Sequence, residues 1–359
     1  MNGRKVYNKI SALGAQAAVF FDEVNMHYIS GFFSTDGFLL VTDEETALVI
    51  DSRYFEAADR AKKDGLLFDD VSLYLLDKSS FRILGEMLEK KGITTVCFDS
   101  DRTTVSRAKS LADFFPSVKF EGVSDICGEF RRVKTAREVE NIRAAQKITD
   151  AAFAHVLNFI RVGVTEKEVA AELEYAMRRN GADGFAFETI AVSGKNSSLP
   201  HGVPSDELLT ENSFLTMDFG ARYNGYCSDM TRTVVLGKAD DKVRDIYETV
   251  LEAQKRGIAA AKAGVDGASV DAAARDYINS RGYEGKFGHS LGHSLGLEIH
   301  ESPRFSSRST DIFVPGNIMT VEPGIYIEGF GGCRIEDMVL ITEDGCENLT
   351  NSPKELIEL

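Results

Sequence analysis

The sequence predicts an α+β protein built from two domains, residues 1–130 and 131–359. Its 359 residues exceed one ordinary domain of roughly 100–200 residues. The first part alternates short β-rich runs with helical stretches, whereas the second part combines long, capped helices with sets of strands. With 43% hydrophobic and 27% charged residues, the chain has the composition of a globular protein that can bury a core.

Residues 1–130 are predicted to form an α/β domain, because β-rich and helical runs alternate along them. The expected strands are Ala17–Phe21, Phe38–Val41, Ala47–Ile50, Thr95–Phe98 and Val118–Phe120. The expected helices are Tyr54–Lys63, Phe81–Lys91 and Val105–Phe115. We interpret His27, the only histidine of this part, as a structural or surface residue.

A helix-start signal marks the domain boundary. In the motif Thr135-x-x-Glu138 the hydroxyl and the carboxylate can satisfy free N–H groups at the beginning of a helix. Apolar residues then recur every three or four positions from Val139 to Ile160, which predicts one long helix with an apolar stripe. We therefore place the boundary just before this helix.

The second domain repeats this pattern. A capping box at Thr165 is expected to begin a helix that ends at Asn180-Gly181, and further helices are expected from Asp241 to Gly264 and from Ser269 to Gly282. The expected strands are Phe187–Ser193, Phe214–Gly220, Tyr226–Leu236, Ile318–Glu322, Gly324–Ile327 and Cys333–Ile341. Helices and strands in this order predict an α+β domain.

Composition excludes several classes of function. A net charge of −15 argues against binding nucleic acid, since most of the surface would repel phosphates. No apolar run reaches the roughly 20 residues that cross a bilayer, and Met1–Ile10 lacks the apolar core of a signal peptide. Five scattered cysteines predict neither a disulfide framework nor a cysteine zinc site. We expect a cytoplasmic protein with no membrane or nucleic-acid partner.

The glycine-rich stretch from Gly288 to Pro303 holds three of the six histidines, His289, His293 and His300. Histidine is the commonest metal ligand and carries protons near neutral pH, although a surface loop with incidental histidines is the simpler alternative. The spacing of His289 and His293 matches a zinc-binding helix, but Ser290 stands where that motif needs a glutamate. Three glycines would each cost a helix about 1 kcal/mol, so an irregular or strand-like segment is expected.

Two aspartates are predicted to share one face of a hairpin. Asn224-Gly225 is a strong two-residue turn signal, and a turn there places Asp218 opposite Thr231. Asp229 lies two residues before Thr231 and so is expected on the same face as Asp218. The two backbones would lie about 7–8 Å apart, which lets both carboxylates reach one ion or a pair of ions.

Two glutamates and an arginine are expected near these aspartates. Glu322 ends an apolar run, and the alternation along Cys333–Ile341 puts Arg334 and Glu336 on one face of a strand. A structural ion pair is the alternative role for Arg334. Four converging carboxylates cannot stay charged in an interior without cations. Two divalent ions would balance them, and His293 would complete a shell that suits manganese, cobalt, iron or zinc.

These residues resemble the pita-bread-fold metallopeptidases, the family of aminopeptidase P, prolidase and methionine aminopeptidase. The resemblance covers Lys134–Leu359 through a series of motifs, namely Pro200-His201-Gly202, Asp218, Ser228-Asp229-Met230-Thr231-Arg232, Gly292-His293-x-x-Gly296, His300-Glu301-x-Pro303, Val321-Glu322-Pro323-Gly324 and Arg334-x-Glu336. The first domain, with Tyr28-Ile29-Ser30-Gly31-Phe32 and Asp51-Ser52-Arg53-Tyr54, is similar to the creatinase/prolidase N-terminal domain.

The resemblance implies the metal ligands Asp218, Asp229, His293, Glu322 and Glu336, with Asp229 and Glu336 bridging two divalent ions per subunit. Manganese or cobalt are the first choices, with zinc or iron as alternatives. It further implies that His201 and His300 bind substrate and stabilise developing negative charge, that His289 belongs to the same site, and that Arg334 pairs with a ligand aspartate. Glu322 is a candidate to carry a proton to the leaving nitrogen.

The implied reaction is hydrolysis of the peptide bond between an N-terminal residue and proline, as in Xaa-Pro dipeptidase or Xaa-Pro aminopeptidase, by a homodimer. Arg304 could bind the terminal carboxylate of a dipeptide, or be an exposed loop residue. The alternatives are a methionine aminopeptidase-like enzyme, which His289 and the N-terminal domain disfavour, and a non-catalytic pita-bread binding protein. The complete ligand set disfavours that binding protein and also the metal-free creatinase.

Overall fold

The computed structural model describes residues 2–359, and the chain divides into two compact units, Met1–Phe130 and Arg131–Leu359. The short helix α6 (Gly128–Arg132) contains the division. Each unit has its own clusters of buried apolar side chains, such as the one that contains Val19 and Leu84 in the first unit. None of the helices formed by residues 2–359 combines the length and apolar character needed to span a lipid bilayer.

The first unit is a six-stranded sheet with helices. Its strand order is β4-β3-β2-β1-β5-β6, in which β1 pairs antiparallel with β2 and parallel with β5. The strands are β1 (Ala17–Phe20), β2 (Phe38–Thr42), β3 (Thr46–Ile50), β4 (Val71–Leu75), β5 (Thr95–Asp99) and β6 (Lys119–Val123). The helices are α1 (Asn2–Ala12), α2 (Glu23–Ser30), α3 (Ser52–Lys63), α4 (Ser80–Lys90) and α5 (Val105–Phe114). All predicted elements are present, while α1, α2 and β4 were not predicted.

The second unit contains two helix pairs. They are α7 (Ala136–Val156) with α8 (Glu166–Arg179), and α9 (Asp241–Ala260) with α10 (Gly267–Ile278). The predicted capping boxes begin α7 and α8. The prediction that a helix runs to Gly264 is wrong, because Ala261 adopts extended backbone and the Gly264 N–H donates to Phe313 instead. Likewise α10 ends at Ile278, before a distorted turn that contains Gly282 at φ 89°.

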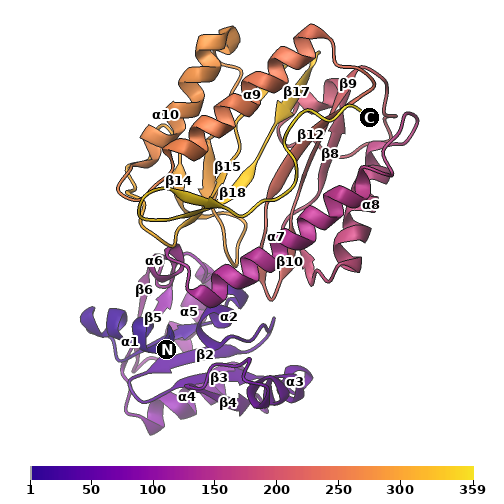
Figure 1. Ribbon diagram of the computed structural model, residues 1–359. Coiled ribbons are helices and arrows are strands. Elements are labelled where there is room, and N and C mark those ends of the chain that lie inside the picture. The colour runs from indigo at the N-terminus through magenta and orange to yellow at the C-terminus, as the bar shows by residue number, and fades with distance from the viewer. Residues whose placement is uncertain (1) are drawn as a thin grey trace. The chain divides into compact units, whose positions relative to one another are not determined.

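The strands of this unit form four sheets. A three-stranded sheet has the order β12-β9-β8, and a five-stranded sheet has the order β14-β13-β15-β18-β19. The strands are β7 (Gly184–Phe185), β8 (Ile190–Ser193), β9 (Ser213–Phe219), β10 (Ala221–Tyr223), β11 (Tyr226–Cys227), β12 (Met230–Leu236), β13 (Gly292–Ser294), β14 (Glu301–Phe305), β15 (Ile318–Val321), β16 (Gly324–Ile327), β17 (Gly331–Arg334), β18 (Asp337–Ile341) and β19 (Cys346–Asn348). The helix pairs α7–α8 and α9–α10 lie on different sides of these strands (Figure 1).

Each helix pair packs on its own set of strands. One core joins α7 and α8 to β9 and β12 through residues such as Leu173 and Met217, and the other joins α9 and α10 to β15 and β18 through residues such as Val250 and Met319. The buried apolar faces of the two helix pairs thus divide the second unit into two halves, each with its own core. Segments from both halves carry the candidate site described below.

Two of the predicted long strands are interrupted. The segment Tyr226–Leu236 is divided into β11 and β12 at Ser228-Asp229, and Cys333–Ile341 is divided into β17 and β18 at Ile335-Glu336. The prediction that Glu336 lies inside a strand is therefore wrong. At this break the Glu336 N–H donates to the Thr231 carbonyl at 3.1 Å, and Arg232 Nη1 donates to the Glu336 carbonyl. These contacts across the unit replace the ladder bonds of a continuous strand.

Candidate metal centre

Five segments deliver the predicted ligands to one place. Asp218 is on β9, Asp229 immediately precedes β12, His293 is on β13, Glu322 follows β15, and Glu336 lies between β17 and β18. Asp218 and Asp229 come from the half that contains α7 and α8. The other three residues follow α9 and α10, so the site depends on the packing of both halves.

The hairpin around Asn224-Gly225 has the predicted register. Tyr223 pairs with Tyr226, and Thr231 pairs with Asp218. Asn224 and Gly225 both have positive φ, 48° and 82°, as a two-residue hairpin turn requires. The turn therefore fixes which residue lies opposite Asp218.

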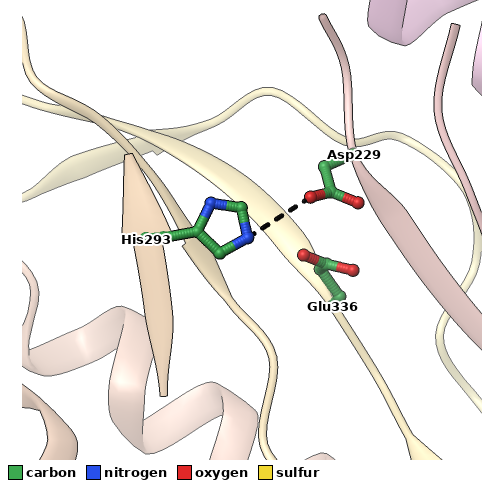
Figure 2. Close-up of side chains that lie close together, drawn as sticks. All are labelled: Asp229, His293 and Glu336. Carbon is green, nitrogen blue, oxygen red and sulfur yellow. Dashed lines mark ion pairs between the residues drawn. The ribbon is translucent and has the colours of Figure 1, made fainter. Parts of the chain in front are cut away.

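The centre of the site is a close group of donor atoms. Asp229, His293 and Glu336 each offer one ligand atom, and these three atoms lie within 4.8 Å of one another. Figure 2 shows the three side chains turned toward one another. His293 Nε2 is 3.5 Å from Asp229 Oδ2 and 3.4 Å from Glu322 Oε1. Asp218 lies close enough to act on the other acids, because its charge adds to burial in raising the pKa of Asp229, Glu322 and Glu336. Distances of this size suit side chains that surround an ion.

Asp229 and Glu336 are buried, Asp218 and Glu322 are half-buried, and the four carboxylates have too few positive charges around them. Burial and the neighbouring carboxylates raise the pKa of Asp229 and of Glu336 well above the ordinary range. Burial and the charge of Asp218 raise the pKa of Glu322 to about 8, although Arg334 opposes this shift. The protein thus holds a cluster of acids that can be fully ionised only when cations are added.

The donor set fits divalent metal ions. Asp218 Oδ1 and Glu336 Oε1 are buried oxygens without a hydrogen-bond partner, which an interior rarely tolerates unless an ion or water binds them. His293 Nδ1 lies 3.1 Å from the Ser294 carbonyl, which favours a proton on Nδ1 and leaves Nε2 facing the acids. Burial, with His300 nearby, lowers the pKa of His293 to about 3, so its ring is neutral as a ligand must be.

Arg334 connects two of the acids. Its Nη2 donates to Asp218 Oδ2 at 2.7 Å, and its Nε donates to Thr231 Oγ1 at 3.0 Å. Thr231 Oγ1 in turn donates to Glu336 Oε2 at 2.8 Å. Arg334 offsets one negative charge of the cluster and fixes the orientation of two carboxylates. The ion pair with an aspartate is the contact that the sequence predicted.

Tyr326 is a site residue that the sequence reasoning missed. Its hydroxyl lies 2.9 Å from His289 Nε2 and accepts from Arg334 Nη1 at 2.7 Å. Alternation along β16 gives the signal that could have identified it, since Gly324 pairs with Arg334 and Tyr326 is two residues further on the same face. A Cβ at position 324 would lie 2.5 Å from the Tyr326 hydroxyl oxygen, so glycine leaves the space that this ring occupies.

The remaining predicted residues surround the acids at different depths. His289 is mostly buried, and its Nδ1 lies 2.9 Å from the Ser290 carbonyl, so both ring nitrogens have partners within the protein. The exposed His300 packs its ring at a steep angle against His293, with 4.5 Å between centroids. Arg304 pairs with His293 in the β13–β14 register. Burial lowers the pKa of His300, and Arg304 and His201 contribute to the same shift. His201 itself is exposed.

Comparison with known proteins finds a matching family for each of the two units. The model of metallopeptidase family M24 matches residues 140–343, and that of the creatinase/prolidase N-terminal domain matches residues 4–133. The Xaa-Pro dipeptidase of Pyrococcus furiosus is 39% identical over 339 residues, which are 93% of this chain and 93% of that protein.

Two solved structures extend over nearly the whole chain. The Xaa-Pro dipeptidase from Bacillus anthracis has a TM-score of 0.93 and 39% identity, over 100% of this chain and 99% of its own. The X-Pro aminopeptidase from Thermotoga maritima has a TM-score of 0.92 and 37% identity, over 98% of this chain and 100% of its own. The pita-bread fold and its creatinase-type N-terminal domain are thereby confirmed. The chain belongs to metallopeptidase family M24, and this membership implies peptide hydrolysis with divalent metal ions.

Proposed function

We propose that this metallopeptidase hydrolyses the peptide bond between an N-terminal residue and proline, using two divalent ions per subunit. The observation that carries the proposal is the group of Asp218, Asp229, His293, Glu322 and Glu336, which combines excess negative charge with buried carboxylate oxygens that have no hydrogen-bond partner. The preference for proline is supported by relatives that are named Xaa-Pro dipeptidase and X-Pro aminopeptidase.

We assign these five residues as the side chains that would hold the metal ions. Nitrogen and oxygen donors without thiolate suit manganese or cobalt, and zinc or iron would also bind such a set. When bound, the ions would lower the pKa of a water molecule and polarise the scissile carbonyl. Arg334 holds Asp218 in the orientation that a ligand needs.

The residues around the acids have proposed roles in substrate binding and proton transfer. His201 and His300, both exposed beside the acids, would donate hydrogen bonds to the substrate carbonyl region and stabilise negative charge as it develops. Glu322 would carry a proton to the proline nitrogen, which must be protonated before it can leave. Because both nitrogens of His289 have protein partners, this residue would contact substrate through its ring carbons.

A peptide panel with defined metals tests the proposal. Metal-stripped enzyme, reconstituted separately with manganese, cobalt, zinc or iron, is assayed on Xaa-Pro and matched Xaa-Ala peptides, together with metal analysis of each sample. We expect turnover of Xaa-Pro peptides that requires added metal, with two ions per subunit, and loss of turnover in Asp218→Ala. Cleavage of Met-Ala peptides as fast as Met-Pro peptides would instead favour a methionine aminopeptidase.

The length of the substrate is tested through Arg304. A guanidinium can bind a terminal carboxylate in a two-pronged contact, and the position of Arg304 beside His293 supports this role. We propose that Arg304→Met raises KM for Xaa-Pro dipeptides while changing KM for Xaa-Pro-Xaa tripeptides little. Equal effects on both substrates would remove this role from Arg304.

We also propose that the enzyme works as a homodimer in the cytoplasm. The support for the dimer is the family resemblance, and the support for the compartment is the set of free cysteines, which a reducing compartment allows. Light scattering on the purified, full-length protein measures the mass directly. A uniform monomer at assay concentration would contradict the dimer.

A further inference from the structure

One buried carboxylate lies outside the metal centre and accepts hydrogen bonds from the loop that carries His201. Glu166 is the first residue of α8, and its side chain is fully buried. It was not among the residues that the sequence singled out, because the capping box at Thr165 and Glu168 explains the start of this helix without it. In Figure 1, α8 and the strand β8, which leads into the loop, lie side by side.

The Glu166 carboxylate accepts hydrogen bonds from both ends of the loop. At the first end of the loop, Ser193 donates from its N–H at 2.6 Å and from its hydroxyl at 3.2 Å, and Asn196 Nδ2, three residues further on, lies 3.2 Å from each oxygen. At the other end, Ser205 donates from its N–H at 3.0 Å and from its hydroxyl at 2.7 Å. All of these groups are hydrogen-bond donors, which the two acceptor oxygens of the carboxylate can satisfy.

The loop between these ends contains little regular structure. Residues 194–198 form a short 3₁₀ helix, and His201 then lies in an exposed turn closed by the Gly202 N–H on the Leu199 carbonyl. On the metal side, Arg334 Nη1 donates to the Pro200 carbonyl at 3.3 Å. A segment with so few ladder bonds needs other contacts to hold one conformation, and Glu166 supplies them at both ends.

We propose that Glu166 is a positioning residue that holds the 193–205 loop so that His201 faces the substrate. The inference rests on the role proposed above for His201. In Glu166→Gln the side chain keeps its volume, but an amide nitrogen replaces one acceptor and meets donors that it cannot satisfy. The loop then samples other conformations, and the contribution of His201 to catalysis is lost.

The test is a double-mutant cycle between Glu166→Gln and His201→Ala in the full-length, metal-loaded enzyme. We expect Glu166→Gln alone to lower kcat/KM by about 10-fold or more, the effect typical of a residue that orients a functional side chain. In the His201→Ala background the same substitution should change kcat/KM little. Metal content should stay at the wild-type level, because Glu166 touches none of the proposed ligands.

Glu168→Ala is the matched control. It removes the capping contacts of Glu168 to Thr165 at the same helix end without touching the loop, so it should lower thermal stability but leave kcat/KM unchanged. Ser205→Ala removes one donor and provides the same cycle if Glu166→Gln does not fold.

Equal losses from Glu166→Gln with and without His201, or none in either background, would overturn the inference alone. Full activity of His201→Ala would overturn the role of His201 as well.

Discussion

Two neighbouring residues, Glu336 and Asp337, are both buried carboxylates, yet their surroundings are opposite. Asp337 accepts from Arg232 at 2.7 Å, Gln254 at 2.9 Å and Asn348 at 2.8 Å, and also from Lys354. Glu336 accepts from Thr231 through one oxygen, and its other oxygen has no partner. Burial would raise the pKa of Asp337, but Arg232 and Lys354 more than offset it, whereas the pKa of Glu336 is strongly raised.

The comparison separates carboxylates that support the fold from those available to a metal. Around Asp337 the protein supplies its own cations, so the charge is satisfied in the folded chain. Around Glu336 the protein gathers Asp218, Asp229 and Glu322, and the cation Arg334 is paired directly with Asp218. Repulsion between these carboxylates destabilises the folded, metal-free protein, and bound cations would remove this repulsion.

Glu336→Gln should abolish activity without harming the metal-free fold. The substitution keeps the volume but removes a proposed ligand oxygen, so turnover of an Xaa-Pro peptide should fall to the assay background. Because one charge leaves an unbalanced cluster, the metal-free variant should unfold at the same temperature as metal-free wild type or at a higher one. A clearly lower unfolding temperature in chelator would show that this carboxylate stabilises the fold by itself.

Asp337→Asn should do the reverse to the metal-free protein. It leaves Arg232 and Lys354 buried without their counter-charge, which typically costs about 3–5 kcal/mol. Urea unfolding of the metal-free variant should report a loss of that order, and the loss should persist after metal is added. A stability equal to that of wild type would remove the distinction between the two neighbours.

Thr231→Val should weaken metal binding more than stability. The hydroxyl accepts from Arg334 Nε and donates to Glu336, so its removal frees both groups. Loss of such an orienting contact typically reduces metal affinity about 10- to 100-fold, which a titration of the stripped enzyme measures. Thr249→Val is the matched control, since that buried hydroxyl donates within α9 to the Asp245 carbonyl. Equal metal affinity in both variants would contradict the orienting role.

Local signals account for what the sequence could predict. The Asn224-Gly225 turn determined which residue faces Asp218, and the capping boxes located the starts of α7 and α8. The break at Glu336 could not be read from alternation, because it depends on a hydrogen bond to the Thr231 carbonyl more than 100 positions earlier in the chain. The short helix α2 was missed because polar residues such as Asn25 and Ser30 are buried in it, which hides an apolar stripe.

The same limit applies to the site. Charge and spacing pointed to the acids and to His293, since clustered carboxylates are a chemical signal that needs no coordinates. The partners of those acids were harder to find. Tyr326 and Glu166 act through contacts that join distant segments of the chain. A tyrosine by itself does not indicate a neighbour of a metal centre, and a single glutamate by itself does not indicate a residue that holds a loop.

Glu301 is a second carboxylate, like Asp337, whose charge is offset by cations of the protein itself. It allows a smaller test through pH. Burial would raise its pKa, but Lys134 and Arg131 more than offset this, so the folded pKa lies below the ordinary value of 4.5. The unfolded chain therefore takes up a proton first as pH falls, and stability that is present above about pH 4.5 is lost as pH decreases through the folded pKa. The free energy of unfolding, measured from pH 6 downward, should fall less steeply in Glu301→Gln than in wild type, although the variant is less stable at neutral pH. Identical slopes would mean that Glu301 is not held ionised by its two cations, and the contrast with the unbalanced acids of the metal centre would then rest on Asp337 alone.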